Sequence, residues 1–98
     1  MSVQMVIEMQ NEQGRQSILS AIEAYKQRLQ ASIVHGQRLL ADFEQRYDVA
    51  TDYFLANMTA EDLEGGDEEY VDWAGEAHLL KGLQTELAEL ENARFQLQ

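Results

Sequence analysis

The sequence predicts an all-α protein, a long helical hairpin with a short acidic connecting helix that dimerises into a four-helix bundle. The 98 residues contain no proline and are rich in glutamine, glutamate, alanine and leucine, which favour long helices. Apolar residues recur every three or four positions over two long stretches, and a glycine pair separates them. We expect one helical domain with four parts: an arm (1–9), a long helix (10–47), an acidic elbow (48–66) and a second long helix (67–95).

The N-terminal arm has two interpretations. Val3, Met5, Ile7 and Met9 alternate with other residues, which is the period of a short strand. Val6 interrupts the alternation. We therefore favour a helical extension or a disordered arm, with a strand as the alternative.

The first long helix carries a seam of apolar and small residues. At about 1.5 Å per residue it would be roughly 55 Å long, so it needs another helix beside it. Gly36 weakens a helix interior by about 1 kcal/mol relative to alanine, which favours close packing at this position over a kink. The seam positions predicted to mediate self-association are Ile22, Leu29, Ser32, Gly36, Leu39 and Phe43.

The elbow is expected to contain a short helix. Thr51 is a candidate N-cap, because its hydroxyl can accept a bond from an amide in the first turn. Tyr53, Phe54, Leu55 and Met58 provide an apolar side. A turn at residues 64–66 follows, where glycine permits a positive φ.

The second long helix is expected to begin near Asp67, a candidate N-cap, with Glu68 and Glu69 in its first turn. Gly75 and Gly82 weaken this helix. We expect both glycines to pack tightly against Ser32 and Gly36 of the first helix, either of the same chain or of another copy, with a functional hinge as the alternative. The apolar stripe predicted for this helix comprises Trp73, Ala77, Leu80, Leu83, Leu87, Leu90 and Leu97.

Charge is distributed unevenly along the chain. The net charge is -11, and the stretch 48–76 holds ten carboxylates without a lysine or arginine. Residues 1–46 hold five acids and five bases. The negative electrostatic potential of this stretch attracts a basic protein and repels nucleic acid and anionic membranes. Cysteine is absent and no apolar run approaches the roughly 20 residues that span a bilayer, so we expect a cytoplasmic protein.

The start of the second helix is the predicted partner-binding surface. Carboxylates four residues apart on a helix repel each other by about 0.2–0.5 kcal/mol per pair, and a basic partner would remove that repulsion. The aromatic residues between them suit an interface or the core of the hairpin, and both interpretations stay open. The predicted contact residues are Asp67, Glu68, Glu69, Tyr70, Asp72, Trp73 and Glu76.

The sequence gives little support for catalysis or metal binding. Neither His35 nor His78 belongs to a Glu-x-x-His pattern, and there is no glycine-rich phosphate loop. The acidic stretch lacks the Asp-x-Asp-x-Asp-Gly order of a calcium loop. We therefore expect no enzyme activity, no metal and no cofactor.

Residues 46–95 carry a family resemblance. The segment 46–54 leads into the acidic turn Gly65-Gly66-Asp67, and the run Asp72-Trp73-Ala74-Gly75-Glu76 precedes a leucine-rich tail. This order resembles small acidic helical proteins of bacteria and cyanobacteria, several of which are proposed antitoxins of toxin–antitoxin pairs. The resemblance implies an inhibitor that masks a basic, ribonuclease-like partner. The alternative function is that of a homo-oligomeric scaffolding bundle.

Overall fold

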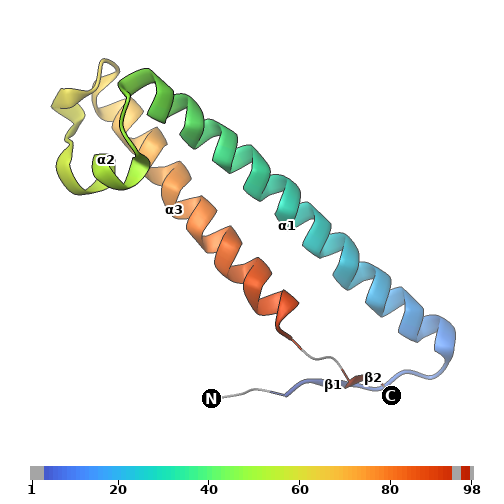
Figure 1. Ribbon diagram of the computed structural model, residues 1–98. Coiled ribbons are helices and arrows are strands. Elements are labelled where there is room, and N and C mark those ends of the chain that lie inside the picture. Colours follow the sequence, from blue (N-terminus) through green and yellow to red (C-terminus); the bar gives the residue numbers. More distant parts are fainter. Residues whose placement is uncertain (1–3, 94–95, 98) are drawn as a thin grey trace.

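The computed structural model describes residues 4–93 and 96–97. Two long antiparallel helices dominate the molecule and are joined at one end by a short helix and a 3-10 turn, which confirms the all-α prediction (Figure 1). A pair of short parallel strands lies at the opposite end. The elements are β1 (Val6–Ile7), α1 (Glu12–Tyr47), α2 (Thr51–Asn57), η1 (Ala60–Asp62), α3 (Gly66–Glu91) and β2 (Gln96–Leu97).

The N-terminal arm differs from the favoured expectation. Val6 pairs with Gln96, and Ile7 pairs with Leu97, in parallel register. The strand alternative therefore holds for these two residues. Helix α1 starts only at Glu12, because the Asn11 side chain accepts the Gly14 amide at 2.8 Å and caps the helix.

Helix α2 begins in a way that the sequence did not predict. Thr51 is the first residue of the helix, and the cap position belongs to Ala50, which makes no side-chain bond. The Thr51 amide instead donates to the Glu44 carboxylate of α1 at 2.7 Å. A side chain from the preceding helix thus caps α2, and the Thr51 hydroxyl is free for another contact.

The start of α3 also corrects an expectation. Asp67 lies inside the first turn, and Gly65 occupies the cap position. Gly66 has a φ of 61°, which glycine adopts without strain. A Cβ atom on Gly65 would lie 2.8 Å from the Glu69 Cβ, so a larger residue does not fit there. The helix ends at Glu91, earlier than predicted, because Asn92 and Ala93 are no longer helical, and residues 94–95 lie outside the described residues. Leu97, which was predicted to belong to the apolar stripe of this helix, lies in β2 instead.

The core is concentrated at the elbow. Phe54, Leu63 and Trp73 form one buried cluster, with Leu40 and Phe43 of α1 among the residues packed against it. Farther along the hairpin, Leu29 and Leu80 are buried. The long arms therefore depend on a cluster at one end of the molecule.

The predicted self-association seam is mostly used within the chain. Leu29 and Gly36 are already buried in a single copy, and Gly36 lies against Leu80 of α3. Phe43 stacks on Trp73. Ile22 and Leu39 are partly buried, whereas Ser32 is exposed. In a single copy, the seam therefore holds α1 against its own α3.

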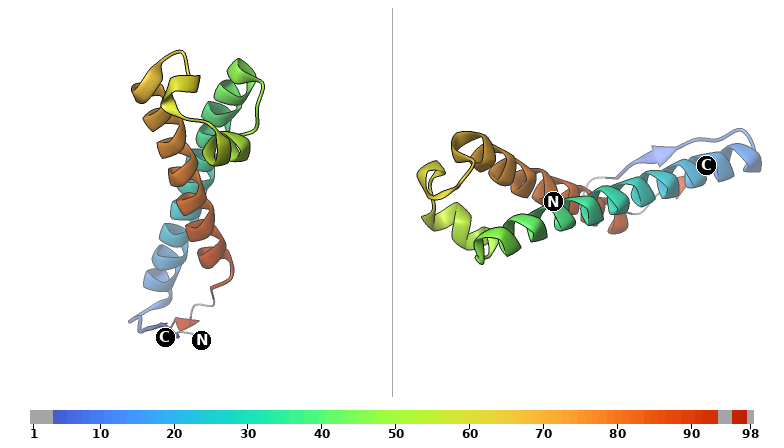
Figure 2. Two further views of the ribbon diagram at one scale, coloured as in Figure 1. Left: turned by 90° about the vertical axis from the view of Figure 1, so that its left-hand side faces the viewer. Right: turned by 90° about the horizontal axis from the view of Figure 1, so that it is seen from above.

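The hairpin is elongated (Figure 2). Its radius of gyration is 19.1 Å, whereas a compact domain of this length has about 13 Å. Its principal extents are 59 × 27 × 19 Å. A large share of the chain therefore faces solvent.

The two glycines inside α3 do not pack against α1 of their own chain, so the expected contact within the chain is wrong, while packing against another copy stays a prediction. A Cβ atom built on Gly75 or Gly82 meets nothing within 4 Å.

We predict that Gly75→Ala and Gly82→Ala each raise the free energy of unfolding by about 0.5–1 kcal/mol, because alanine is the better helix former. Urea denaturation at one protein concentration measures this change. Gly65→Ala is the contrasting variant and should lower stability, since its Cβ would clash with Glu69. Unchanged or lower stability of both α3 variants would contradict the prediction.

Candidate interaction surface at the elbow

The Trp73 side chain is the centre of the elbow. It is 0% exposed. Phe54 of α2 stacks on it with ring centroids 3.8 Å apart and planes within 2°. Phe43 and Tyr47 of α1 stack at 5.2 and 5.7 Å. Each such aromatic pair adds about 0.5–1.5 kcal/mol beyond area burial, so one indole joins all three helices.

A buried hydrogen bond completes this junction. The Trp73 indole Nε1 donates to the Thr51 hydroxyl oxygen at 3.0 Å, and Thr51 is itself buried. Because the Thr51 amide donates to Glu44, the bonds run from α3 through α2 to α1. No buried side-chain nitrogen or oxygen lacks a partner in the part of the chain that the structure describes.

Two members of the predicted contact group belong to the interior instead. Trp73 is inaccessible, which settles its open interpretation in favour of the core. Tyr70 is partly buried and packs on Phe54, with ring centroids 5.0 Å apart. The aromatic residues that the sequence placed among the acids therefore build the scaffold under the surface.

Glu69 is also engaged within the chain. Its side chain is 14% exposed and accepts a bond from the Arg46 guanidinium at 2.6 Å. The Tyr47 hydroxyl donates to the other carboxylate oxygen and accepts the Glu64 amide at 3.0 Å. The expected repulsion at the start of α3 is therefore partly relieved, because a cation from α1 reaches a carboxylate 23 positions away.

Most other carboxylates of the elbow face solvent. Of the ten between residues 48 and 76, all except Glu69 and Glu76 are exposed. Asp67, Glu68 and Asp72 are exposed at the start of α3. Within residues 4–93, the ion pairs are Arg46–Glu69 and a local pair in the first turn of α1, so these three acids have no cationic partner.

Two residues that the sequence assigned to the apolar side of the short helix are exposed instead. Tyr53 is 54% exposed, and Leu55 is 46% exposed. The inward positions are Thr51 and Phe54 of α2 and Met58 at its C-cap, which follow the three- and four-residue spacing of one helix face. In so short a helix the residues on either side of Phe54 must point outward. The three- and four-residue spacing of the inward residues could have predicted this exposure.

The described residues form no group of three histidine, cysteine or acidic side chains that could hold a metal ion. His35 and His78 are both exposed. Over the same residues, no helix combines the length and apolar character required to cross a bilayer.

The fold and surface define a helical hairpin with an acidic head built on a tryptophan junction. The chain matches no protein-family model, no curated protein and no solved structure. The resemblance to small acidic helical proteins, some of them proposed antitoxins, therefore stays a prediction from the sequence of residues 46–95.

The Thr51–Trp73 bond yields a stability prediction. Thr51→Val keeps the shape but leaves the indole N–H buried without an acceptor, so it should lower the free energy of unfolding by about 1–3 kcal/mol. Thr51→Ser retains the hydroxyl and should lose only about 0.8 kcal/mol for the methyl group. Urea denaturation followed by Trp73 fluorescence compares the two variants. A valine variant at least as stable as the serine variant would contradict the role of the bond.

The acids of α3 should separate into structural and surface groups. Glu69→Ala removes the acceptor for Arg46 and Tyr47 and should destabilise the fold by about 1.5–3 kcal/mol. Glu68→Ala, one position earlier and exposed, should change stability by no more than about 0.5 kcal/mol. Thermal and urea unfolding of the two variants provide the comparison. Equal effects would show that the contacts of Glu69 do not hold the elbow.

Proposed function

We propose that this chain is a non-enzymatic binding protein whose acidic elbow docks onto a basic protein. The observation that carries the proposal is the set of exposed carboxylates on a head fixed by the buried Trp73 junction. A preorganised surface loses little conformational entropy on binding, so more of its interaction free energy contributes to affinity.

Electrostatics supports a basic partner. Arg46 reaches the acidic stretch and is already paired with Glu69. The exposed acids therefore create a negative potential that speeds association with cations and weakens as salt screens it. Charge complementarity of this kind chiefly sets the association rate and the choice of partner.

The elbow surface has a place for a basic side chain. A shallow hollow of about 270 Å³ is lined by residues that include Phe43, Arg46, Glu68 and Asp72. The Arg46 guanidinium lies 5.8 Å from the centre of the Phe43 ring, so this surface already accommodates one arginine. An arginine of the partner would bind beside it, with its charge toward Glu68 and Asp72.

The proposed contact group differs from the one predicted from the sequence. Asp67, Glu68 and Asp72 remain as exposed acids. Tyr53 replaces Trp73 as the aromatic anchor, since tyrosine is enriched at binding hot spots and this one is accessible. Glu69 and Tyr70 support the surface from beneath.

The resemblance to antitoxins suggests a specific version of this function. An antitoxin-like inhibitor would cover the cationic surface where a ribonuclease holds its substrate. The elbow carboxylates would then take the positions of RNA phosphates. Self-assembly is the second candidate function, and it is supported by the large exposed surface of the elongated hairpin.

The binding proposal is tested with a charge-reversed elbow. The double variant Glu68→Lys/Asp72→Lys should bind the basic protein captured by the wild type from its native cells at least about tenfold more weakly, mainly through slower association. The control Glu89→Lys/Glu91→Lys makes the same change in net charge at the far end of α3 and should retain affinity. Surface plasmon resonance over a range of salt concentrations measures both. Equal losses in the two variants, or affinity that does not change with salt, would refute the proposal.

A further inference from the structure

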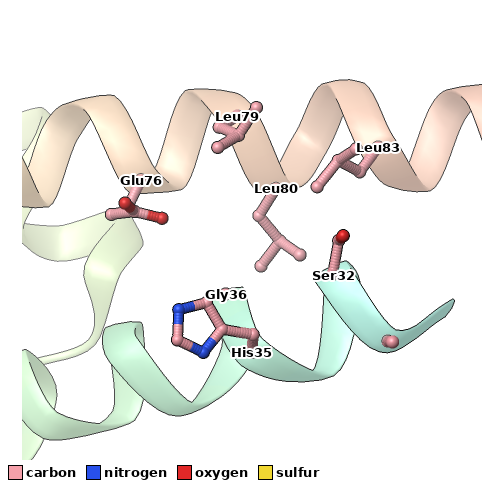
Figure 3. A pocket seen from close by; sticks show the side chains of 8 residues that line it. Ser32, His35, Gly36, Glu76, Leu79, Leu80 and Leu83 are labelled. Carbon is pink, nitrogen blue, oxygen red and sulfur yellow. The ribbon is translucent and has the colours of Figure 1, made fainter. Parts of the chain in front are cut away.

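A groove runs between α1 and α3 along the side of the hairpin, away from the elbow cluster (Figure 3). Its volume is about 480 Å³. The α1 wall includes the small residues Ser32 and Gly36, and the α3 wall includes Leu79 and Leu83. Glu76 lines the end of the groove that is nearer the elbow. The groove is therefore apolar over most of its length, with a carboxylate at one end.

The groove continues the hollow at the elbow. On α3, Asp72 of the hollow and Leu79 of the groove are one heptad apart, so both side chains leave the helix on the same face. On α1, the same spacing relates Phe43 of the hollow to Gly36 of the groove. The two depressions therefore follow each other on one side of the hairpin, between the same two helices.

Two features of the groove lack a complement within the chain. The α1 residues Ala31, Ser32 and Gly36 are too small to cover the leucines, and Leu79 remains 55% exposed. Glu76 is partly buried and has no ion-pair partner within residues 4–93. An occupant that supplies both an apolar side chain and a cation would complement both features.

We propose that this groove binds an amphipathic basic helix of the partner protein. The inference rests on the proposed function and names the structural element that the acidic surface receives. Glu68, Asp72 and Glu76 lie on successive turns of α3, and the cations of the bound helix would follow them. An apolar side chain of the same helix would cover Leu79 and Leu83.

The walls of the groove favour a helix over an extended segment. Both walls are helices, so their backbone N–H and C=O groups are already bonded within α1 and α3. They offer no strand edge with which the backbone of an extended segment could pair. A helix bonds its own backbone and needs only side-chain contacts with the groove.

The length of the acidic and apolar strip sets the length of the bound helix. Residues 68–83 of α3 span about 22 Å at about 1.5 Å per residue, which corresponds to about four helical turns. The half near the elbow carries the carboxylates, and the other half carries the leucines. A matching helix has about 16 residues, with cations on one half of a face and leucine-like side chains on the other half.

Charge favours this occupant over a second copy of the chain. Each copy has a net charge of -11, so two copies repel each other at long range. Lys81 is the single lysine or arginine of α3, and it does not line the groove. A basic helix instead brings the opposite charge to Glu68, Asp72 and Glu76.

The test uses the full chain and a synthetic peptide of about 16 residues. The peptide carries arginines on one half and leucines on the other half of a single helix face, with alanine and glutamine elsewhere. A control peptide of identical composition distributes the leucines around the helix. Fluorescence anisotropy at low salt should show that the amphipathic peptide binds at least about tenfold more tightly than the control. Equal affinities would overturn the proposal.

Variants of the chain locate the contact. Leu79→Gln should weaken peptide binding by about tenfold, because it removes apolar contact without adding a charge. Val71→Gln is the matched control, since Val71 is an exposed apolar residue of α3 that does not line the groove. Glu76→Gln should weaken binding and reduce its salt dependence, whereas Glu89→Gln near the far end of α3 should change neither. Equal effects within either pair of variants would overturn the groove site.

Glycine amide signals in NMR spectra report where the peptide lies. The Gly36 amide in the groove should shift when the peptide binds, and the Gly82 amide outside the groove should not. A peptide that shifts only signals of the elbow would overturn the groove site. A wild-type chain that sediments as a dimer, together with a monomeric Leu79→Gln variant, would assign the groove to a second copy instead.

Failure of the groove is distinguishable from failure of the elbow function. Leu79→Gln leaves the elbow acids in place, and Glu68→Lys/Asp72→Lys leaves the leucines in place. If only the charge-reversed variant loses affinity for the basic protein captured by the wild type, the groove inference falls and the elbow function stands. If neither variant loses affinity, both are overturned.

Discussion

The Trp73 indole is the point at which the three helices are fixed to one another. Its ring is covered by aromatic side chains from α1 and α2, and its N–H is held by Thr51. The rest of the hairpin has few fully buried side chains, so the packing that sets the register between α1 and α3 is strongest at this end. A helix as long as α1 is stable mainly through such tertiary packing. Packing around Trp73 therefore fixes both the acidic head and the arrangement of the two long helices.

The carboxylates of this region act in two different ways. Glu44 caps α2 through the Thr51 amide, and Glu69 links α3 to Arg46 and Tyr47. These two stabilise the elbow from within. The exposed acids at the start of α3 add no contact of that kind and keep their charge directed to solvent. These exposed carboxylates repel one another and form no stabilising contact within the chain. Such a surface is well suited to binding a cationic partner.

The helices and their inward faces were largely predictable, whereas the details of the elbow were not. Spacing of three and four residues predicts both α1 and α3, because these helices extend over many turns. The N-caps predicted at Thr51 and Asp67 were wrong. The Glu44 carboxylate of α1 accepts the Thr51 amide at the start of α2, and Gly65 occupies the cap position of α3. The predicted packing of Gly75 and Gly82 against α1 of the same chain was also wrong, because periodicity does not reveal what lies beside an exposed helix face. Which acids are paired depends on Arg46, and only the folded arrangement brings this residue to Glu69.

Trp73 is the single tryptophan of the chain, so its fluorescence tests the central claim without any mutation. Collisional quenching by iodide and by acrylamide compares the native protein with the urea-unfolded chain. A buried indole that joins three helices should be almost unaffected by either quencher until the fold is lost. Quenching in the native state as efficient as in the unfolded chain would contradict the buried junction, and with it the preformed acidic head.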